Sequence, residues 1–70
     1  MLHYKGYDIS TTTLHAEGPA VSETAYVVRK GETVVRRGTM RGPFYSEEVA
    51  HFVAEVGARE WIDRDAPVGP

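Results

Sequence analysis

The stretch that decides the fold is residues 46–61, SEEVAHFVAEVGAREW. Ser46 is a preferred helix N-cap, because its hydroxyl can accept a hydrogen bond from a free backbone N–H in the first turn. Glu47 and Glu48 would follow at the positive end of the helix dipole. Four apolar residues then recur with the spacing i, i+3, i+4, i+7, namely Val49, Phe52, Val53 and Val56. The stretch therefore predicts an amphipathic helix from Ser46 to about Asp63.

The apolar row of this helix is expected to be its buried face, flanked by Ala50, Gly57 and Trp61. The opposite side carries the polar residues Glu47, His51, Glu55 and Arg59. A buried Phe52 would make Phe52→Ala cost about 3–5 kcal/mol. Glu60 falls near the centre of the apolar face. It either overhangs the sheet and stays in water or pairs with an arginine of the preceding strands.

Upstream, Thr24–Lys30 and Thr33–Thr39 predict a β-hairpin closed by Gly31-Glu32. Gly31 suits the first central position of a two-residue type II′ turn, where φ must be positive. That register pairs Val28 with Val35, and Tyr26 with Arg37. It places four residues on the opposite face of the hairpin, namely Val27, Arg29, Val34 and Arg36. A longer loop would change these pairs.

Further upstream, Tyr4–Leu14 reads as one strand rich in β-branched and aromatic residues. Gly18-Pro19 and Gly42-Pro43 mark a loop and a turn. The predicted fold class is α+β, a three-stranded antiparallel β-meander packed against one C-terminal α-helix (β-β-β-α). Residues 1–64 would form the single domain and residues 65–70 a disordered tail. The predicted core consists of Tyr7, Ile9, Tyr26, Val28, Val35, Phe44, Val49, Phe52, Val53, Val56 and Trp61.

The composition of this 70-residue chain excludes several kinds of functional site. It has no cysteine, which excludes disulfides, a thiol nucleophile and thiolate metal ligands. The three histidines show no ligand spacing, and neither a catalytic constellation nor a phosphate-binding glycine loop is present. We therefore expect no enzyme activity, no cofactor and no metal site. Without an apolar signal segment or a membrane-length run, a cytoplasmic location is expected.

Charge is unevenly distributed around a net value of −2. Residues 29–41 contain five basic residues and one acidic residue. The candidate partner-binding face combines Val27, Arg29, Val34 and Arg36, with Lys30, Arg37 and Arg41 nearby. This cluster is either ordinary solvated surface or a basic binding patch.

Two segments resemble a group of short uncharacterised bacterial proteins. They are YKGYDI (residues 4–9) and GPFYSEEVA (residues 42–50), the latter followed by Trp61-Ile62-Asp63. The resemblance implies a three-stranded sheet followed by one helix and implies no activity. At fold level the order is also similar to the three-stranded DNA-binding domains of AP2 proteins and some phage-type integrases. Those domains read DNA with arginine and tryptophan on the exposed sheet face, and no strand predicted here carries a tryptophan.

Two functions are compatible with these features. One is a small non-catalytic interaction or structural module of bacterial type, whose partner would be a second copy of the chain or an acidic protein. The other is a nucleic-acid-binding module that uses the exposed sheet face, which the negative net charge disfavours. Any partner is expected to bind the open sheet face rather than the helix.

Overall fold

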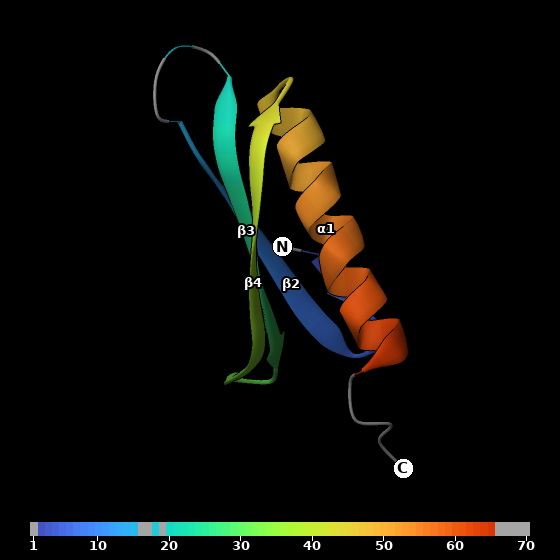
Figure 1. Cartoon of the computed structure of the whole chain (residues 1–70). Coiled ribbons are helices and arrows are strands. Elements are labelled where there is room, and N and C mark those ends of the chain that lie inside the picture. Colours follow the sequence, from blue (N-terminus) through green and yellow to red (C-terminus); the bar gives the residue numbers. More distant parts are fainter. Residues whose placement is uncertain (1, 16–17, 19, 66–70) are drawn as a thin grey trace.

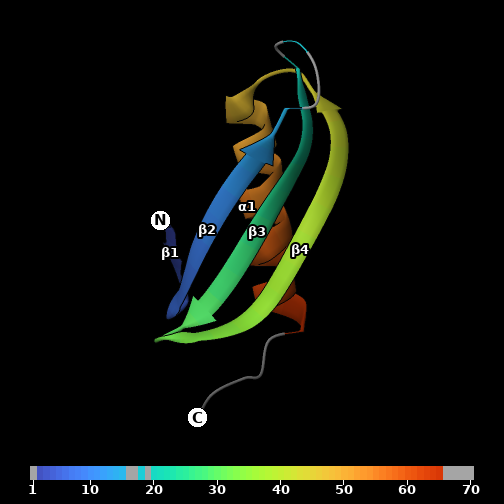
Figure 2. The same cartoon turned by 90° about the vertical axis from the view of Figure 1, so that its left-hand side faces the viewer.

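The computed structural model describes residues 2–15, 18 and 20–65. Its elements are β1 (Leu2–Tyr4), β2 (Tyr7–Leu14), β3 (Val21–Lys30), β4 (Thr33–Phe44) and α1 (Glu47–Arg64). The strands form one antiparallel sheet in the order β1-β2-β3-β4, and α1 crosses one face of it (Figures 1 and 2). The α+β class, the antiparallel sheet and the C-terminal helix are confirmed. The predicted number of three strands is wrong, since the sheet has four.

The additional strand arises from a tight turn inside the predicted first strand. Lys5 and Gly6 both have positive φ, at 50° and 84°. Two consecutive residues in this region are the signature of a type I′ turn, whose twist matches that of an antiparallel hairpin. β1 therefore folds back on β2 and pairs Leu2 with Ile9. The sequence signal was weak because lysine rather than asparagine or aspartate precedes the glycine.

The β3–β4 hairpin begins in the predicted register and then leaves it. Gly31 has a φ of 61°, and Arg29 pairs with Val34 across the turn as expected. An irregularity between Val28 and Arg29 then leaves Val35 as the extra residue of β4, so that Val28 faces Arg36. The predicted pairing of Val28 with Val35 is therefore wrong. One inserted residue moves every following side chain of β4 to the other face.

β4 also continues through the predicted turn at Gly42-Pro43 and ends at Phe44, which pairs with Val21. Proline is tolerated here because β4 is an edge strand, and an edge strand has no ladder to interrupt on its outer side. The long β4 lets the sheet reach the start of α1.

The predicted helix cap is confirmed. Ser46 has extended backbone angles, and its hydroxyl accepts a hydrogen bond from the Val49 N–H at 3.2 Å. Glu47 and Glu48 occupy the first turn. At the other end, the Asp65 N–H donates to the Trp61 carbonyl at 2.8 Å. Residues 66–70 of the predicted tail lie outside the described residues.

The face that α1 turns to the sheet is the opposite of the predicted one. A row at i, i+4, i+8 and i+12 is buried, namely Ala50, Ala54, Ala58 and Ile62. The sheet supplies the large side chains, among them Tyr7, Tyr26 and Met40. Space between the layers is short, because a Cβ on Gly57 would lie 2.1 Å from Met40 Cε. Small helical residues are therefore needed where the sheet is bulky.

This packing changes the core. Tyr7, Ile9, Tyr26 and Val28 are buried as predicted. Three predicted core residues are wrong because they are exposed, namely Val35, Val49 and Phe52. Four others are half-buried, namely Phe44, Val53, Val56 and Trp61. The buried residues outside the predicted core are Val21, Thr24, Ala50, Ala54, Ala58 and Ile62.

Candidate interaction surfaces

The sheet face away from α1 carries part of the predicted binding patch. Arg29 and Val34 are paired, and Val27 pairs with Arg37 in the next row. Arg36 does not belong to this face. Its guanidinium carbon lies 5.9 Å from the centre of the Trp61 ring of α1, on the helix side. The bulge at Val35 is the cause, because it exchanges the faces of Arg36 and Arg37.

The other basic residues of the patch are dispersed. Lys30 directs its ammonium toward Tyr7, with Nζ 5.4 Å from the ring centre. Arg41 pairs in register with Glu23, and Arg29 with Asp8 of β2. Within the described residues, Arg29, Arg37 and Arg41 form no ion pair. Among the described residues, the open face therefore presents three guanidinium groups without an ion-pair partner, in register beside the carboxylates of Asp8 and Glu23.

The face of α1 that points away from the sheet is apolar, although a helix face in contact with solvent is usually polar. We use the name outer row for Val49, Phe52, Val53 and Val56. Val49 is 42% exposed and Phe52 is 59% exposed, whereas Val53 and Val56 are half-buried. Tyr45, just before the helix, is 94% exposed. Glu60 lies in water, and the predicted pairing with a hairpin arginine is not found among the described ion pairs.

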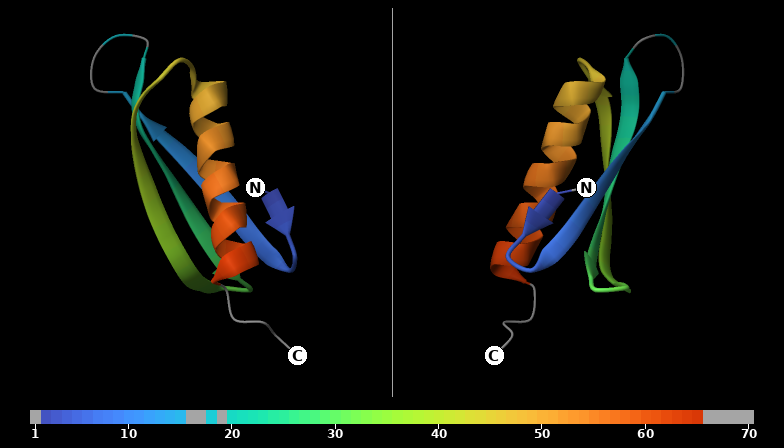
Figure 3. Two further views of the ribbon diagram at one scale, coloured as in Figure 1. Left: turned by 45° about the vertical axis from the view of Figure 1, so that its right-hand side comes forward. Right: turned by 180° about the vertical axis from the view of Figure 1, so that it is seen from behind.

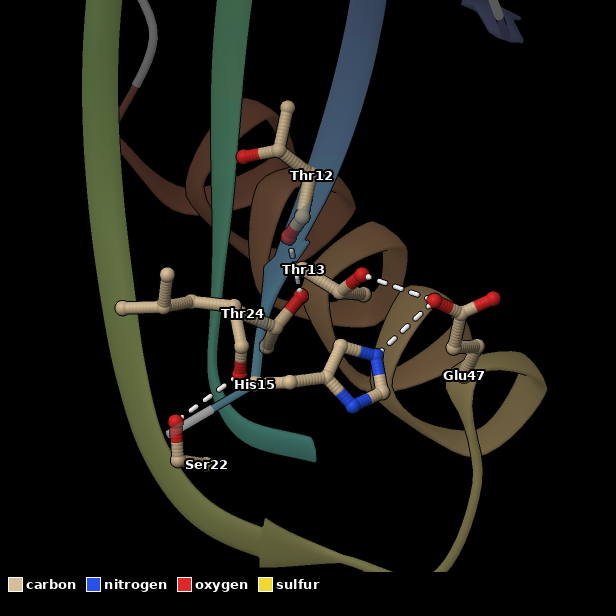
Figure 4. A network of polar contacts seen from close by, with 7 residues as sticks. Thr12, Thr13, His15, Ser22, Thr24 and Glu47 are labelled. Atoms are coloured by element: carbon tan, nitrogen blue, oxygen red, sulfur yellow. Dashed lines mark hydrogen bonds and ion pairs between the residues drawn. The ribbon is translucent and has the colours of Figure 1, made fainter. Parts of the chain in front are cut away.

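A polar network joins the first turns of α1 to β2. The Thr11 hydroxyl and His51 Nδ1 are hydrogen bonded at 2.6 Å. His51 therefore lies beside the sheet, whereas it was predicted on the side of the helix opposite the buried face. Glu47 Oε1 lies 2.9 Å from His15 Nε2 and accepts from the Thr13 hydroxyl at 3.4 Å (Figure 4). These contacts hold the pKa of Glu47 below its usual value, chiefly through the hydrogen bond from His15.

A second polar contact fastens the other end of α1 to the β1–β2 turn. Lys5 Nζ lies 2.6 Å from Asp63 Oδ1, and the Tyr4 hydroxyl donates to both Asp63 oxygens at 2.9–3.0 Å. The hydrogen bond between Lys5 and Asp63 raises the pKa of Lys5 and lowers that of Asp63. These residues are exposed, so the contact orients the turn more than it stabilises the fold.

A surface pocket of about 440 Å³ lies between the β1–β2 pair and α1 and is lined by Leu2, Ile9, Ser10, Thr11, His51 and Glu55. A further pocket, of about 430 Å³, lies beside Phe44 and Tyr45. In the residues that the structure describes, no group of three or more potential metal ligands comes together. In the same residues, no helix is long and apolar enough to cross a membrane.

No protein-family model matches this chain, and neither does any curated protein or solved structure. The resemblances to short bacterial proteins and to AP2-type and integrase-type domains therefore stay predictions.

Proposed function

We propose that this protein is a small non-catalytic interaction module that self-associates through the outer row of α1. The observation that carries the proposal is the orientation of α1, whose small residues and not its large apolar residues face the sheet. Alanines face the sheet, while Phe52 and Val49 face solvent. An apolar helical row normally covers a core, and one that leaves large apolar side chains exposed, as here at Val49 and Phe52, is typical of an interaction surface.

A second copy of the chain suits this surface because of the charges beside it. Glu48 and Arg59 are eleven positions apart, about three helical turns, and so lie on the same flank of the outer row. A two-fold axis between two antiparallel helices brings equal flanks together. With the axis near Ala54, Glu48 of each copy lies beside Arg59 of the other. Phe52 then packs against Val56 of the other copy.

Sedimentation velocity over a range of about 10 µM to 1 mM tests this proposal, because it covers the affinities expected of a small interface. We expect the wild-type chain to shift from monomer to dimer and Phe52→Ala to remain monomeric. Leu14→Ala is the matched control. Leu14 is 57% exposed, nearly the same as Phe52, but lies on β2. This control should dimerise like the wild type.

A charge exchange tests the antiparallel arrangement. Glu48→Arg and Arg59→Glu should each weaken the dimer, because each brings like charges together. The double variant should recover the wild-type equilibrium. A wild-type chain that stays monomeric throughout the range would refute self-association, and a dimer lost in Leu14→Ala would move the interface to the sheet.

Nucleic-acid binding by the open sheet face is the second candidate. Its support is the set Arg29, Arg37 and Arg41, which have no ion-pair partner in the described residues. Phosphate contacts by these side chains would give affinity that falls steeply with salt. The test is a DNA mobility assay across salt concentrations. Arg37→Ala should weaken binding at every sequence, and an unchanged salt slope in this variant would exclude the face.

A further inference from the structure

β2 is longer than the strand that covers its outer edge. β1 pairs only with Tyr7–Ile9, whereas β2 continues to Leu14. Within the described residues, no strand lies beside the outer edge of β2 from Ser10 to Leu14 (Figure 3). An open strand edge presents backbone donors and acceptors that can pair with another extended segment.

The side-chain hydrogen bonds of β3 show which backbone groups face that edge. The Thr24 hydroxyl donates to the Thr12 carbonyl at 2.9 Å, and the Ser22 hydroxyl donates to the Leu14 carbonyl at 2.8 Å (Figure 4). The carbonyls of Thr12 and Leu14 therefore point toward β3. Backbone groups alternate in direction along an antiparallel strand. The N–H and C=O groups of Thr11 and Thr13 consequently point away from β3, to the open edge.

The pocket of about 440 Å³ lies where an added strand would pass. Leu2, Ile9 and Thr11 line it from the sheet, and His51 and Glu55 line it from α1. A strand that continued the line of β1 would place one of its helix-facing side chains in this pocket, because side chains alternate along a strand. The volume is in the range of natural small-ligand pockets and is sufficient for one long side chain.

The acidic residues beside the outer edge of β2 favour a cationic side chain in the pocket. Glu55 lines the pocket, and Glu47 lies two helical turns before it on the same side. Within the described residues neither carboxylate meets a lysine or arginine at ion-pair distance, and Glu47 contacts only His15 in this way. A cationic side chain in the added strand would therefore complete the pocket.

We propose that the outer edge of β2 from Ser10 to Leu14 binds an extended peptide segment of a partner protein by strand addition. Backbone pairing with Thr11 and Thr13 holds the segment, and the pocket at Glu55 takes one lysine or arginine. This site does not depend on the outer row of α1, so the failure of either proposal leaves the other standing.

Amide chemical shifts of the full chain, titrated with a short peptide, test the site. The probe is acetyl-Thr-Val-Lys-Val-Thr-amide at up to about 5 mM, enough to reveal millimolar affinity. The matched control replaces its lysine with glutamate. We expect the lysine peptide to shift the amides of Thr11, Thr13 and His51 and to slow exchange at Thr11 and Thr13. The glutamate peptide should bind more weakly.

Two variants separate the backbone from the pocket. Thr13→Pro removes one outward donor without a ladder bond to β3 and should abolish binding in a chain that keeps its circular dichroism. Glu55→Gln should weaken the lysine peptide about two- to fivefold, the range of a partly exposed ion pair. Glu60→Gln, at an exposed position of α1, is its control and should bind like the wild type.

If Thr13→Pro does not fold, the comparison of the lysine peptide with the glutamate peptide and the Glu55→Gln variant still test the proposal. Equal binding of the two peptides would refute the charge selection. Shifts confined to Phe52 and Val56, or to Val27 and Arg37, would place the peptide on another surface and overturn the proposal. No shift with either peptide would also overturn it.

Discussion

Replacement of Phe52 or Ala54 by glutamine gives opposite expectations for the two orientations of α1. In the structure Phe52 is 59% exposed and Ala54 is fully buried. A phenylalanine side chain offers about 150–250 Å², so about 60–100 Å² of it is buried, worth about 1.5–2.5 kcal/mol. That range is an upper bound for Phe52→Gln, because extended-chain references overestimate burial. A fully buried Phe52 would cost about 3–5 kcal/mol.

Ala54→Gln is expected to be the more damaging change. The longer side chain overpacks a layer already close to Tyr7 and Tyr26, which costs about 1–3 kcal/mol. Its amide group would also be buried without a hydrogen-bond partner, which adds about 1–3 kcal/mol to the loss of unfolding free energy. The sum of about 2–6 kcal/mol is comparable to the whole stability of a domain of this size.

Urea unfolding at low micromolar concentration measures both changes, followed by the fluorescence of Trp61. This ring packs edge-on against Tyr7, with centroids 6.5 Å apart, and so reports on the core. Ala54→Ser, a milder change, covers the case in which Ala54→Gln does not fold. A larger loss of unfolding free energy for Phe52→Gln than for Ala54→Gln would refute the observed orientation of the helix.

Three further outcomes are expected. Gly38→Ala should lower the unfolding free energy by about 1–3 kcal/mol, because its Cβ would lie 2.4 Å from the ring of Tyr26; an unchanged urea midpoint would contradict this contact. Ser46→Ala should cost about 1 kcal/mol through loss of the helix cap, while Ser46→Asp, tested in the same melts, should keep most of it. The lowered pKa of Glu47 contributes stability that is complete above the ordinary glutamate pKa and is lost as the pH falls through the lowered one. His15→Gln should therefore flatten the acid limb of a stability–pH profile, and an identical limb would show that His15 does not act on Glu47.

Local chemistry alone was sufficient for several elements. Ser46 caps α1 because a hydroxyl next to free N–H groups needs no tertiary partner. Gly31 closes the β3–β4 hairpin because positive φ is inexpensive only for glycine. The alternation of Tyr7 and Ile9, and of Tyr26 and Val28, marked the buried side of β2 and β3.

The basic patch and the open edge of β2 were harder to predict, because each depends on how two neighbouring strands pair. Arg36 and Arg37 are adjacent arginines, and only the bulge at Val35 decides which of them reaches the open face. The edge of β2 became visible only in the structure, where the Lys5-Gly6 turn folds β1 back onto β2 and β1 pairs with Tyr7–Ile9. Neither feature leaves a signal in the periodicity of the chain.

The sequence by itself predicted a helix from Ser46 to about Asp63, close to the Glu47–Arg64 of α1, and an antiparallel sheet of the preceding strands. It did not determine which side of the helix meets the sheet, because α1 carries two rows with helical spacing. One row is large, around Phe52, and the other is small, at Ala50, Ala54 and Ala58. The bulk of Tyr26 and Met40 on the sheet decided between them, since the layers approach closely only where the helix is small. That choice, made across the tertiary interface, turned the apolar row outward.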